Sequence, residues 1–541
     1  MERRNFITKL GYASALWALA PAITSCFQSH REKFKGEIVG ANSAIGHKLR
    51  DQQFAQPSVT KHVRTLILGA GVAGLSAART LKKNGDEDFV VIELADQPGG
   101  NSASGKNEVS EYPWGAHYLP VINPNNHDLY DFLREHEIII GENERGILYN
   151  PLYLCADPEE RLHIQGYWQS GLIPTLGLSE QEKQEIAAFF STMEKMRNAI
   201  GTDGKNAFDI PVANSSDDPA FIQFDQIDMK TWLQQMGWNT SYLHWYVNYC
   251  CKDDYGTKYD ETSAWAGIHY FASRKGRVVD GGHEDVLTWP EGNQFLVQKL
   301  LHGNHAKLQL KELAFEIKCE DEQVIVKTWQ AEKDQVIQYT ADAVICCLPR
   351  YIIQKLNPEL ITSTGYLPGY APWMVANITL VGQPQTIAGA PLSWDNVLYN
   401  SNSLGYVNAC HQKIRVYNNK TVLTYYYPVS DLSPTEARQM MHSKTHEEWC
   451  HDILQDLQYA HPDIAKQIED IQVWMWGHGM VRPVPGFYTD DQRRQAATPH
   501  QKKIFFAHSD LSGISIFEEA FSHGHRAAQE VLQYYFQRKT T

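Results

Sequence analysis

The sequence predicts an α/β protein in which one domain is built around a parallel sheet from distant segments, with an α+β domain interleaved between them. A strand, turn, helix and strand pattern occupies residues 65–93, and strand-like apolar segments return at 341–349 and 503–508. An aromatic block with helical character lies between them, at 189–282. Parallel strands need long connections, so such distant strands can share one sheet if the intervening residues form a domain of their own.

The opening unit, residues 65–78, contains three glycines at G-x-G-x-x-G spacing. In a turn that binds a dinucleotide, Gly69 permits the bend, Gly71 lets a pyrophosphate approach the backbone, and Gly74 lets the helix pack closely. The helix N-terminus offers N–H groups and a positive dipole end to the phosphates. Glu93, twenty-four residues after Gly69, ends the next strand, where an acid accepts hydrogen bonds from ribose hydroxyls. Glycines alone also suit an ordinary turn, but this combination predicts a Rossmann-like site for NAD or FAD.

Residues 1–26 have the features of an export signal. Arg3 and Arg4 precede an Ala-rich apolar stretch, residues 10–23, which is too short to span a bilayer comfortably. This pattern resembles a twin-arginine signal, and a soluble amphipathic helix is the alternative. Cys26 ends a segment similar to a lipoprotein box, so we expect membrane contact only through a lipid anchor there. The twin-arginine route carries folded proteins, which suits a protein loaded with its cofactor before it reaches the periplasm or the outer face of the membrane.

Composition and charge narrow the partners. The formal net charge is −14, and it becomes about −16 without the basic first 25 residues, which argues against nucleic acid and favours small cationic molecules. The nine cysteines show no C-x-x-C or Cys/His spacing that would indicate a metal site. Cys346 and Cys347 lie in an apolar segment, where we expect buried thiols. Residues 27–60 are polar and lack periodicity, so we expect a linker.

Two further glycine elements follow the opening unit. Gly99 and Gly100 belong to a Pro-Gly-Gly turn, and Gly115, Ala116 and His117 follow about fifteen residues later. With the opening motif, this order resembles the superfamily of FAD-dependent amine oxidases and phytoene desaturases. The resemblance implies that the paired glycines pass the FAD pyrophosphate and ribityl chain, and that the Gly-Ala-His element runs beside the flavin.

The C-terminal segment resembles the closing signature of the same superfamily. Residues 503–510 form a strand that ends in an acid, and residues 516–528 form a helix after a short loop. The resemblance implies that Asp510 binds the ribityl chain, with Ser509 as the alternative, and that Phe517 lies beside the flavin at the helix start. The resemblance also favours FAD over NAD, because a nicotinamide dehydrogenase does not need a C-terminal strand and helix that contact its cofactor. The superfamily's basic residue after the paired glycines is replaced here by Asn101.

These landmarks predict the domain boundaries. The FAD-binding domain comprises residues 61–150, 285–360 and 495–535, and the substrate domain comprises residues 151–284 and 361–494. Alternating apolar residues predict a hairpin at 313–327 and antiparallel strands at 375–381 and 422–427.

The sequence therefore predicts an exported, amine oxidase-like FAD oxidoreductase that oxidises a small organic substrate by hydride transfer to the flavin. His117 is the predicted catalytic residue, since histidine acts as acid or base near neutral pH, and a structural histidine is the alternative. Amine oxidases of this family often hold the substrate nitrogen between two aromatic rings, and the matching positions here are Gly479 or Met480 and Ile516. This departure leaves two alternatives open: a desaturase or isomerase acting on a lipid-like or polyene substrate, and a redox-silent binding protein.

Overall fold

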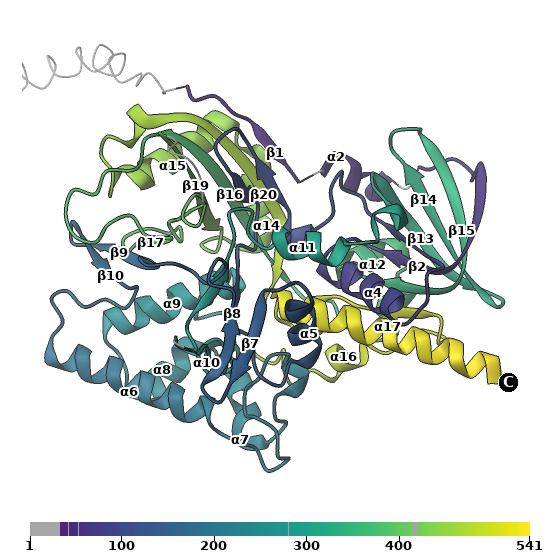
Figure 1. Ribbon diagram of the computed structural model, residues 1–541, viewed down its shortest axis with the longest axis horizontal. Helices are drawn as coiled ribbons and strands as arrows, with labels where there is room; N and C mark the ends of the chain where they lie inside the picture. Colours follow the sequence, from purple (N-terminus) through teal and green to yellow (C-terminus); the bar gives the residue numbers. More distant parts are fainter. Residues whose placement is uncertain (1–32, 42, 52, 280, 414–418, 541) are drawn as a thin grey trace, which may run out of the picture.

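The computed structural model describes residues 33–540 apart from 42, 52, 280 and 414–418. The predicted export signal and Cys26 lie outside these residues. Two sheets organise the described chain, and they lie in separate lobes, with β2 and β13–β15 in one lobe and β16, β19 and β20 in the other (Figure 1). Among the described helices, none combines the length and apolar character needed to cross a bilayer.

The first sheet has seven strands, in the order β12-β3-β2-β15-β14-β13, with β21 paired beside the end of β15. Strands β2, β3, β12, β15 and β21 run parallel, and β13 and β14 are antiparallel. The predicted hairpin is confirmed as β13–β14, and the apolar segment at 341–349 is confirmed as the end of a buried strand. The strands are β2 (Val59–Leu68), β3 (Phe89–Ile92), β12 (Leu308–Gln309), β13 (Glu312–Glu320), β14 (Gln323–Gln330), β15 (Gln335–Cys346) and β21 (Ile504–Phe506).

The parallel strands of this sheet end together. Leu68 of β2 pairs with Cys346 of β15, which pairs with Phe506 of β21, while Ile92 of β3 lies on the other side of Leu68. The loops that follow these strands therefore leave from one edge of the sheet. This carboxyl edge is where open α/β sheets bind their ligands.

Helices cover both faces of the first sheet. One face packs on α4 (Val72–Lys83), α5 (His127–Glu135), α11 (Gln294–Leu301) and α17 (Phe517–Thr540), and the other on α12 (Arg350–Leu356) and α13 (Glu359–Thr362). The last helix, α17, begins between the lobes and runs along the first sheet toward the C-terminus (Figure 1). It packs closely on α4, because a Cβ on Gly524 would stand 2.1 Å from the carbonyl oxygen of Ala73.

The second sheet has eight strands, in the order β1-β20-β16-β19-β18-β17-β9-β10. The predicted antiparallel strands at 375–381 and 422–427 are confirmed, since they lie in β16 and β19, which pair in that sense. The strands are β1 (Ile38–Gly40), β9 (Glu160–Ile164), β10 (Tyr167–Ser170), β16 (Tyr370–Val381), β17 (Asp395–Leu398), β18 (Tyr406–Asn408), β19 (Lys420–Pro428) and β20 (Ile468–Val481).

Alternate residues of β16 face two different cores. Trp373 and Val375 pack with the helices of the predicted aromatic block, whereas Met374 and Ala376 pack with α14 and α15 on the opposite face. This is the period of two that a strand buried on both faces requires. The helices are α6 (Glu180–Arg197), α8 (Met229–Gln235), α9 (Ser241–Tyr255) and α10 (Ala264–Ala272) on the first side, and α14 (Pro434–Ser443) and α15 (His446–Gln458) on the second.

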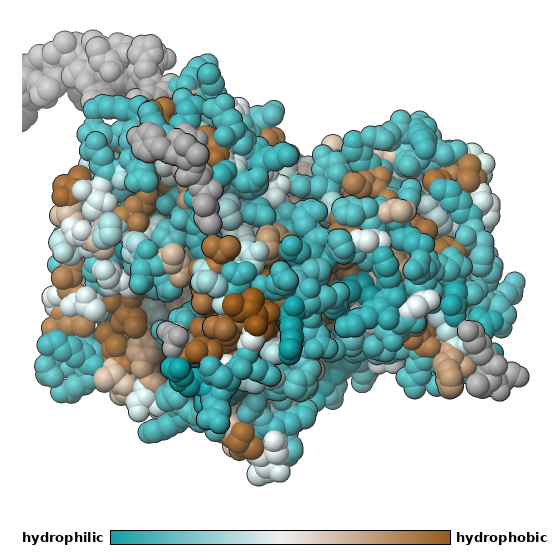
Figure 2. All heavy atoms as spheres, in the orientation of Figure 1, coloured by the Kyte–Doolittle hydropathy of each residue, from teal (hydrophilic) through white to brown (hydrophobic). Residues whose placement is uncertain are grey.

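Smaller elements complete the chain. Three strand pairs, β4–β5, β6–β11 and β7–β8, lie outside the two main sheets. Ile140 and Leu148 of the β7–β8 hairpin are exposed. Figure 2 shows a mainly hydrophilic face on which apolar residues gather in one area. The β7–β8 hairpin lies in that area in Figure 1, which has the same orientation. The strands are β4 (Ser104–Lys106), β5 (Glu111–Pro113), β6 (Tyr118–Pro120), β7 (Ile139–Asn143), β8 (Gly146–Tyr149) and β11 (Val286–Thr288), and the short helices are α7 (Pro219–Ile222) and α16 (Asp491–Gln495).

The expected linker, residues 27–60, is not a free tether where the structure describes it. Ile38–Gly40 forms β1 beside β20, and short helices α2 (Ser43–Gly46) and α3 (Lys48–Asp51) follow. Leu49 is buried, and the ring of Phe54 stacks on Phe315 with 3.9 Å between centroids. A few apolar residues thus attach this polar stretch to the two lobes, too sparsely for a periodic signal. The prediction was wrong for these residues.

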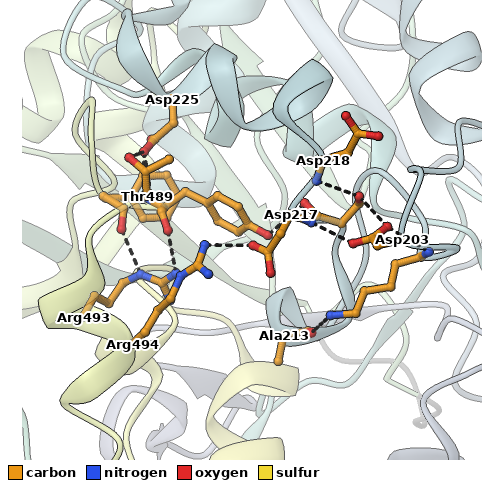
Figure 3. A network of polar contacts seen from close by, with 12 residues as sticks. Asp203, Ala213, Asp217, Asp218, Asp225, Thr489, Arg493 and Arg494 are labelled. Carbon is orange, nitrogen blue, oxygen red and sulfur yellow. Dashed lines mark hydrogen bonds and ion pairs between the residues drawn. The ribbon is translucent and has the colours of Figure 1, made fainter.

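A polar network joins Asp225, in the predicted substrate domain, to residues 487–511, which precede α17 (Figure 3). Asp225 accepts hydrogen bonds from the backbone N–H and the hydroxyl of Thr489, each at 2.9 Å. The Arg493 guanidinium donates to the carbonyls of Phe487, Tyr488 and Leu511. Because Leu511 precedes α17, this network fixes the approach of α17 to the lobe boundary.

Candidate active site

The G-x-G-x-x-G turn joins β2 to α4. Gly69 has φ of +97°, a conformation that favours glycine, and a Cβ on Gly74 would stand 1.9 Å from the carbonyl oxygen of Gly69. A Cβ on Gly71, by contrast, would have no atom within 4 Å. Since the first N–H groups of a helix lack intrahelical partners, the space beside Gly71 at the start of α4 suits an anionic group.

Glu93 is held at the end of β3 by the backbone. Its carboxylate accepts hydrogen bonds from the N–H groups of Ala70 and Ala95, each at 2.8 Å. Burial raises the pKa of Glu93, and these hydrogen bonds oppose that shift. The carboxylate keeps acceptor capacity for the ribose hydroxyls that the sequence predicts there.

The Pro-Gly-Gly turn lies directly against the first turn. The N–H of Gly99 donates to the carbonyl of Ala70 at 2.9 Å, and Gly71 and Gly99 form an isolated parallel bridge. Gly99 and Gly100 both have positive φ, +132° and +57°. The two glycine turns, thirty residues apart in sequence, therefore form one backbone surface.

Buried polar atoms without a protein partner lie beside these turns and point to a ligand-binding site. Among the described residues, Gln294 Oε1 and Asn293 Oδ1 are buried without a hydrogen-bond partner. Gln294 Oε1 would lie 2.5 Å from a Cβ on Gly99, so this amide faces the Pro-Gly-Gly turn. The space beside Gly71 fits the pyrophosphate of FAD. The Glu93 carboxylate and these amide oxygens are hydrogen-bond acceptors, so they fit its hydroxyl groups.

A large cavity lies where the loops of the first sheet meet β16 and β20 of the second. It encloses about 990 Å³ of space between protein atoms, part of it open to solvent. The predicted residues Gly115, Ala116, His117 and Phe517 all line it.

His117 stands among aromatic rings in this cavity. Its imidazole stacks on Tyr426 at 4.6 Å between centroids and lies 5.1 Å from the ring of Tyr118 and 5.6 Å from that of Trp394. Burial lowers the pKa of His117 to about 4. The imidazole is therefore neutral at physiological pH, and its role as the catalytic residue stays a prediction.

Carboxyl groups dominate the charge of the cavity. Asp253 and Asp254 at the end of α9 and Glu518 at the start of α17 line it, opposed by Arg274. Arg274 donates to Asp254 and to the Tyr118 hydroxyl, each at 3.2 Å. Burial raises the pKa of Asp253 and of Glu518 to about 7. The sequence did not predict that these carboxyl groups belong to the site, because two acids at the end of a helix are usually solvent-exposed.

The Asp510 side chain forms hydrogen bonds within the protein, and Asp510 is not among the residues that line the cavity. One carboxylate oxygen accepts from the Arg350 N–H at 2.8 Å and from the Tyr370 hydroxyl at 2.6 Å, and the other lies 3.1 Å from His508 Nδ1. Although burial raises the pKa of Asp510, His508 and these donors lower it overall. Ser509, the alternative, makes no side-chain hydrogen bond within the described chain. Contact of either residue with the ribityl chain stays a prediction.

The positions expected for an aromatic pair are apolar but not aromatic. Met480 and Ile516 both line the cavity, and the rings there come instead from residues such as Trp373 and Trp476. Asn101, which stands in place of a basic residue, lines the cavity too and donates from its amide to the carbonyl of Gly479. It therefore joins the Pro-Gly-Gly turn to β20.

Among the described residues, no three His, Cys, Asp or Glu side chains gather in a way that would hold a metal ion. Cys346 and Cys347 are free and buried, as expected.

Comparison with known proteins gives the family. The family model described as flavin containing amine oxidoreductase matches residues 72–532. The chain belongs to this family. It is therefore an FAD-dependent oxidoreductase, and the predicted superfamily, enzyme class and cofactor are confirmed. No curated protein sequence matches the chain.

Several solved structures show the same fold. A putrescine oxidase double mutant covers 88% of the chain and 100% of its own, with a TM-score of 0.63 at 16% identity. Cyclohexylamine oxidase from Brevibacterium oxydans covers 88% and 99%, with a TM-score of 0.62 at 14% identity. A fatty acid isomerase from P. acnes, described as producing CLA, covers 86% and 97%, with a TM-score of 0.57 at 15% identity. The predicted fold class, a Rossmann-like FAD-binding domain with an interleaved α+β domain, is confirmed.

Proposed function

We propose that this flavoprotein is an exported amine oxidase that removes a hydride from the carbon beside the nitrogen of a small cationic substrate. The observation that carries the proposal is the carboxyl wall of Asp253, Asp254 and Glu518, opposed only by Arg274 among the charged side chains described as lining the cavity. Carboxyl groups whose pKa is raised by burial gain most from a bound cation, and a protonated amine supplies one.

The residues of the cavity suit the steps such a reaction needs. Bound FAD supplies the hydride acceptor. An ammonium group must first lose a proton, because the nitrogen lone pair forms the C=N bond as the hydride leaves. Asp253 and Glu518, with pKa values of about 7, are matched to accept that proton near neutral pH. His117, with a pKa of about 4, is a weaker base.

The aromatic residues would orient the substrate. The rings of His117 and Tyr426 stack, and the Tyr426 hydroxyl donates to the carbonyl of Gly115 at 2.9 Å, which fixes the plane of that ring. Putrescine oxidase and cyclohexylamine oxidase act on amines by their names, which supports the same substrate class here.

A second candidate is a desaturase or isomerase acting on a lipid-like substrate. Val375, Met480 and Ile516 give part of the cavity an apolar surface, and the similar fatty acid isomerase supports this alternative. The charged wall favours the amine, because a lipid chain would leave Asp253 and Glu518 without a cationic partner.

Flavin reduction distinguishes the candidates. Purified holoprotein would be mixed without oxygen with putrescine, cyclohexylamine and benzylamine while the flavin absorbance is followed. In parallel it would be mixed with linoleate while both the flavin absorbance and the absorbance of conjugated dienes are followed, because an isomerase returns the hydride to its product and leaves the flavin oxidised. We expect bleaching by at least one amine, and neither bleaching nor diene formation with the lipid. Bleaching or diene formation with linoleate, without bleaching by any amine, would overturn the amine proposal, and a purified protein without flavin absorbance would support the redox-silent alternative.

Export is proposed from the N-terminal residues alone. Replacement of Arg3 and Arg4 by lysine should retain the protein in the cytoplasm, because the twin-arginine pair is the signal that the route reads. Cell fractionation with antibody detection measures this. Cys26→Ser should release an exported protein from the membrane fraction if a lipid anchor is present; unchanged fractionation of both variants would contradict the localisation.

A further inference from the structure

The N-terminal strap, residues 33–41, is attached to a strand that lines the active-site cavity. Its strand β1 pairs with β20 (Figure 1), where Gly40 is the register partner of Trp474. The backbone N–H of Val473 donates to the carbonyl of Glu37 at 3.0 Å. None of residues 33–41, all of which are described, lines the cavity itself. An influence of the strap on the cavity must therefore pass through β20.

Gly40 of the strap contacts the ring of Trp474. A Cβ on Gly40 would stand 2.2 Å from the ring atoms Cδ2 and Cε3 of Trp474, so any side chain at position 40 would displace that ring or the strap. The indole Nε1 of Trp474 is buried without a hydrogen-bond partner among the described residues. The orientation of this ring therefore depends on packing, and Gly40 supplies one side of it.

Two more indoles connect Trp474 to the cavity. The ring of Trp474 lies 5.2 Å from that of Trp114 and 5.3 Å from that of Trp476, measured between centroids. The carbonyl of buried Trp114 accepts a hydrogen bond from Nε1 of Trp476 at 2.6 Å. Trp476 lines the cavity, whereas Trp474 is not among the described residues that line it. Trp474 therefore stands between the strap and a residue of the cavity wall.

Trp476 belongs to an aromatic surface inside the cavity. Trp476 of β20 and Trp373 of β16 are register partners in neighbouring antiparallel strands, so their indoles project from the same face of the sheet. Both residues line the cavity. Aromatic rings attract one another beyond their buried area, and the gain depends on their relative orientation. A ligand with an aromatic ring would therefore be sensitive to the orientation of Trp476.

We propose that Trp474, held by Gly40, is a positioning residue that fixes Trp476 so that Trp476 and Trp373 bind the ring of an aromatic ligand. This inference rests on the proposed function for its biological meaning, since the ring would belong to the amine substrate. It gives the strap, which contributes no residue to the cavity, a role in ligand selectivity.

The experiment uses holoprotein and two neutral probes of similar size, benzyl alcohol with an aromatic ring and cyclohexylmethanol with a puckered one. Binding is followed by the change in flavin absorbance. We expect the wild type to bind benzyl alcohol about threefold or more tightly than cyclohexylmethanol, because of the aromatic surface. Gly40→Ala and Trp474→Leu should bring this ratio close to one, whereas Trp474→Phe, which keeps a ring, should retain most of it.

Matched variants separate positioning from stability. Gly46→Ala changes the same N-terminal segment, but its Cβ would meet Leu94 at an ordinary 3.8 Å, so the ratio should keep its wild-type value. Trp449→Phe shortens a fully buried side chain on α15, so it should lower the melting temperature without changing the ratio. A ratio that falls in Trp449→Phe as much as in Gly40→Ala would reflect general destabilisation and overturn the proposal.

The outcomes separate this inference from the proposed function, because both probes are alcohols without an ammonium group. Equal or absent binding of the two probes to the wild-type protein overturns the aromatic surface, whether or not any amine reduces the flavin. An unchanged ratio in either Gly40→Ala or Trp474→Leu overturns the positioning role. A ratio that depends on both residues supports the role even if every amine fails as a reductant, and that result would overturn only the amine oxidation.

Discussion

The carbonyl oxygen of Gly69 fills the place where a side chain at Gly74 would begin, 1.9 Å from an ideal Cβ. Gly71, between them in the same motif, has no atom within 4 Å of its own Cβ position. The fold of the protein itself therefore requires glycine at position 74. Position 71 requires glycine only if something else, the cofactor, comes close.

Gly71→Ala should consequently fold normally and bind FAD poorly. Its backbone, with φ of −72° and ψ of −176°, is open to alanine, so the melting temperature of the apoprotein should not change. The added methyl group would stand where the pyrophosphate approaches, and we expect at least about tenfold weaker binding, or about 1.4 kcal/mol. Titration of apoprotein with FAD, followed by flavin fluorescence, measures this. Gly74→Ala is the matched variant and should fail to fold; wild-type FAD affinity in Gly71→Ala would contradict the placement of the cofactor.

Stability should fall as the pH rises from about 5 to 7, in part because of Glu518. Burial raises its folded-state pKa to about 7 from an ordinary value of 4.5. The folded protein therefore binds the proton more tightly than the unfolded chain does. Its contribution is full below the unfolded pKa and is lost as the pH rises through the folded pKa.

Melting temperatures at pH 5 and pH 8 test this assignment. Glu518→Gln cannot ionise, so the variant should lose less stability than the wild type over that interval. Glu359→Gln, which changes a carboxyl on α13, should behave like the wild type. Identical pH dependence in all three proteins would mean that Glu518 keeps an ordinary pKa.

The sequence predicted those parts of the molecule whose signals are local. The glycine turn, the β13–β14 hairpin and the Cys346 strand each carry their pattern within about twenty residues. Glu160 and Asp395 are 235 positions apart and meet only because β9 and β17 pair in parallel. Asp253 and Glu518 likewise come to line one cavity only through the packing of α9 and α17 around it, so the acidic wall had no sequence signal.

The Asp225 network should be a major source of stability. Its buried carboxylate accepts from the Ser263 hydroxyl at 2.7 Å, from the Tyr488 N–H at 2.9 Å and from both donors of Thr489. Asp225→Ala would leave these donors unsatisfied, and we expect a loss of about 3 kcal/mol in the free energy of unfolding. Asp217→Asn, which breaks the exposed pair with Arg494 in the same region (Figure 3), should cost about 1 kcal/mol or less. Denaturant unfolding of both variants measures the difference; similar losses would mean that the buried network is not decisive.

His117→Phe tests whether the imidazole acts through its shape or its proton. The ring stacks on Tyr426, and its pKa of about 4 keeps it neutral, whereas Asp253 and Glu518 have pKa values of about 7. If the carboxyls accept the substrate proton, the rate of anaerobic flavin reduction should rise with pH through about 7, because the ionised carboxylate is the base. His117→Phe keeps a flat aromatic ring at this position, so we expect the variant to retain that rise of the rate with pH. We also expect it to lose less than about tenfold in rate, since the loss of an acid–base group costs about a hundredfold or more. His117→Ala, which removes the ring, should lose more. A loss of a hundredfold or more in His117→Phe, together with a flattened pH profile, would instead assign the proton transfer to His117.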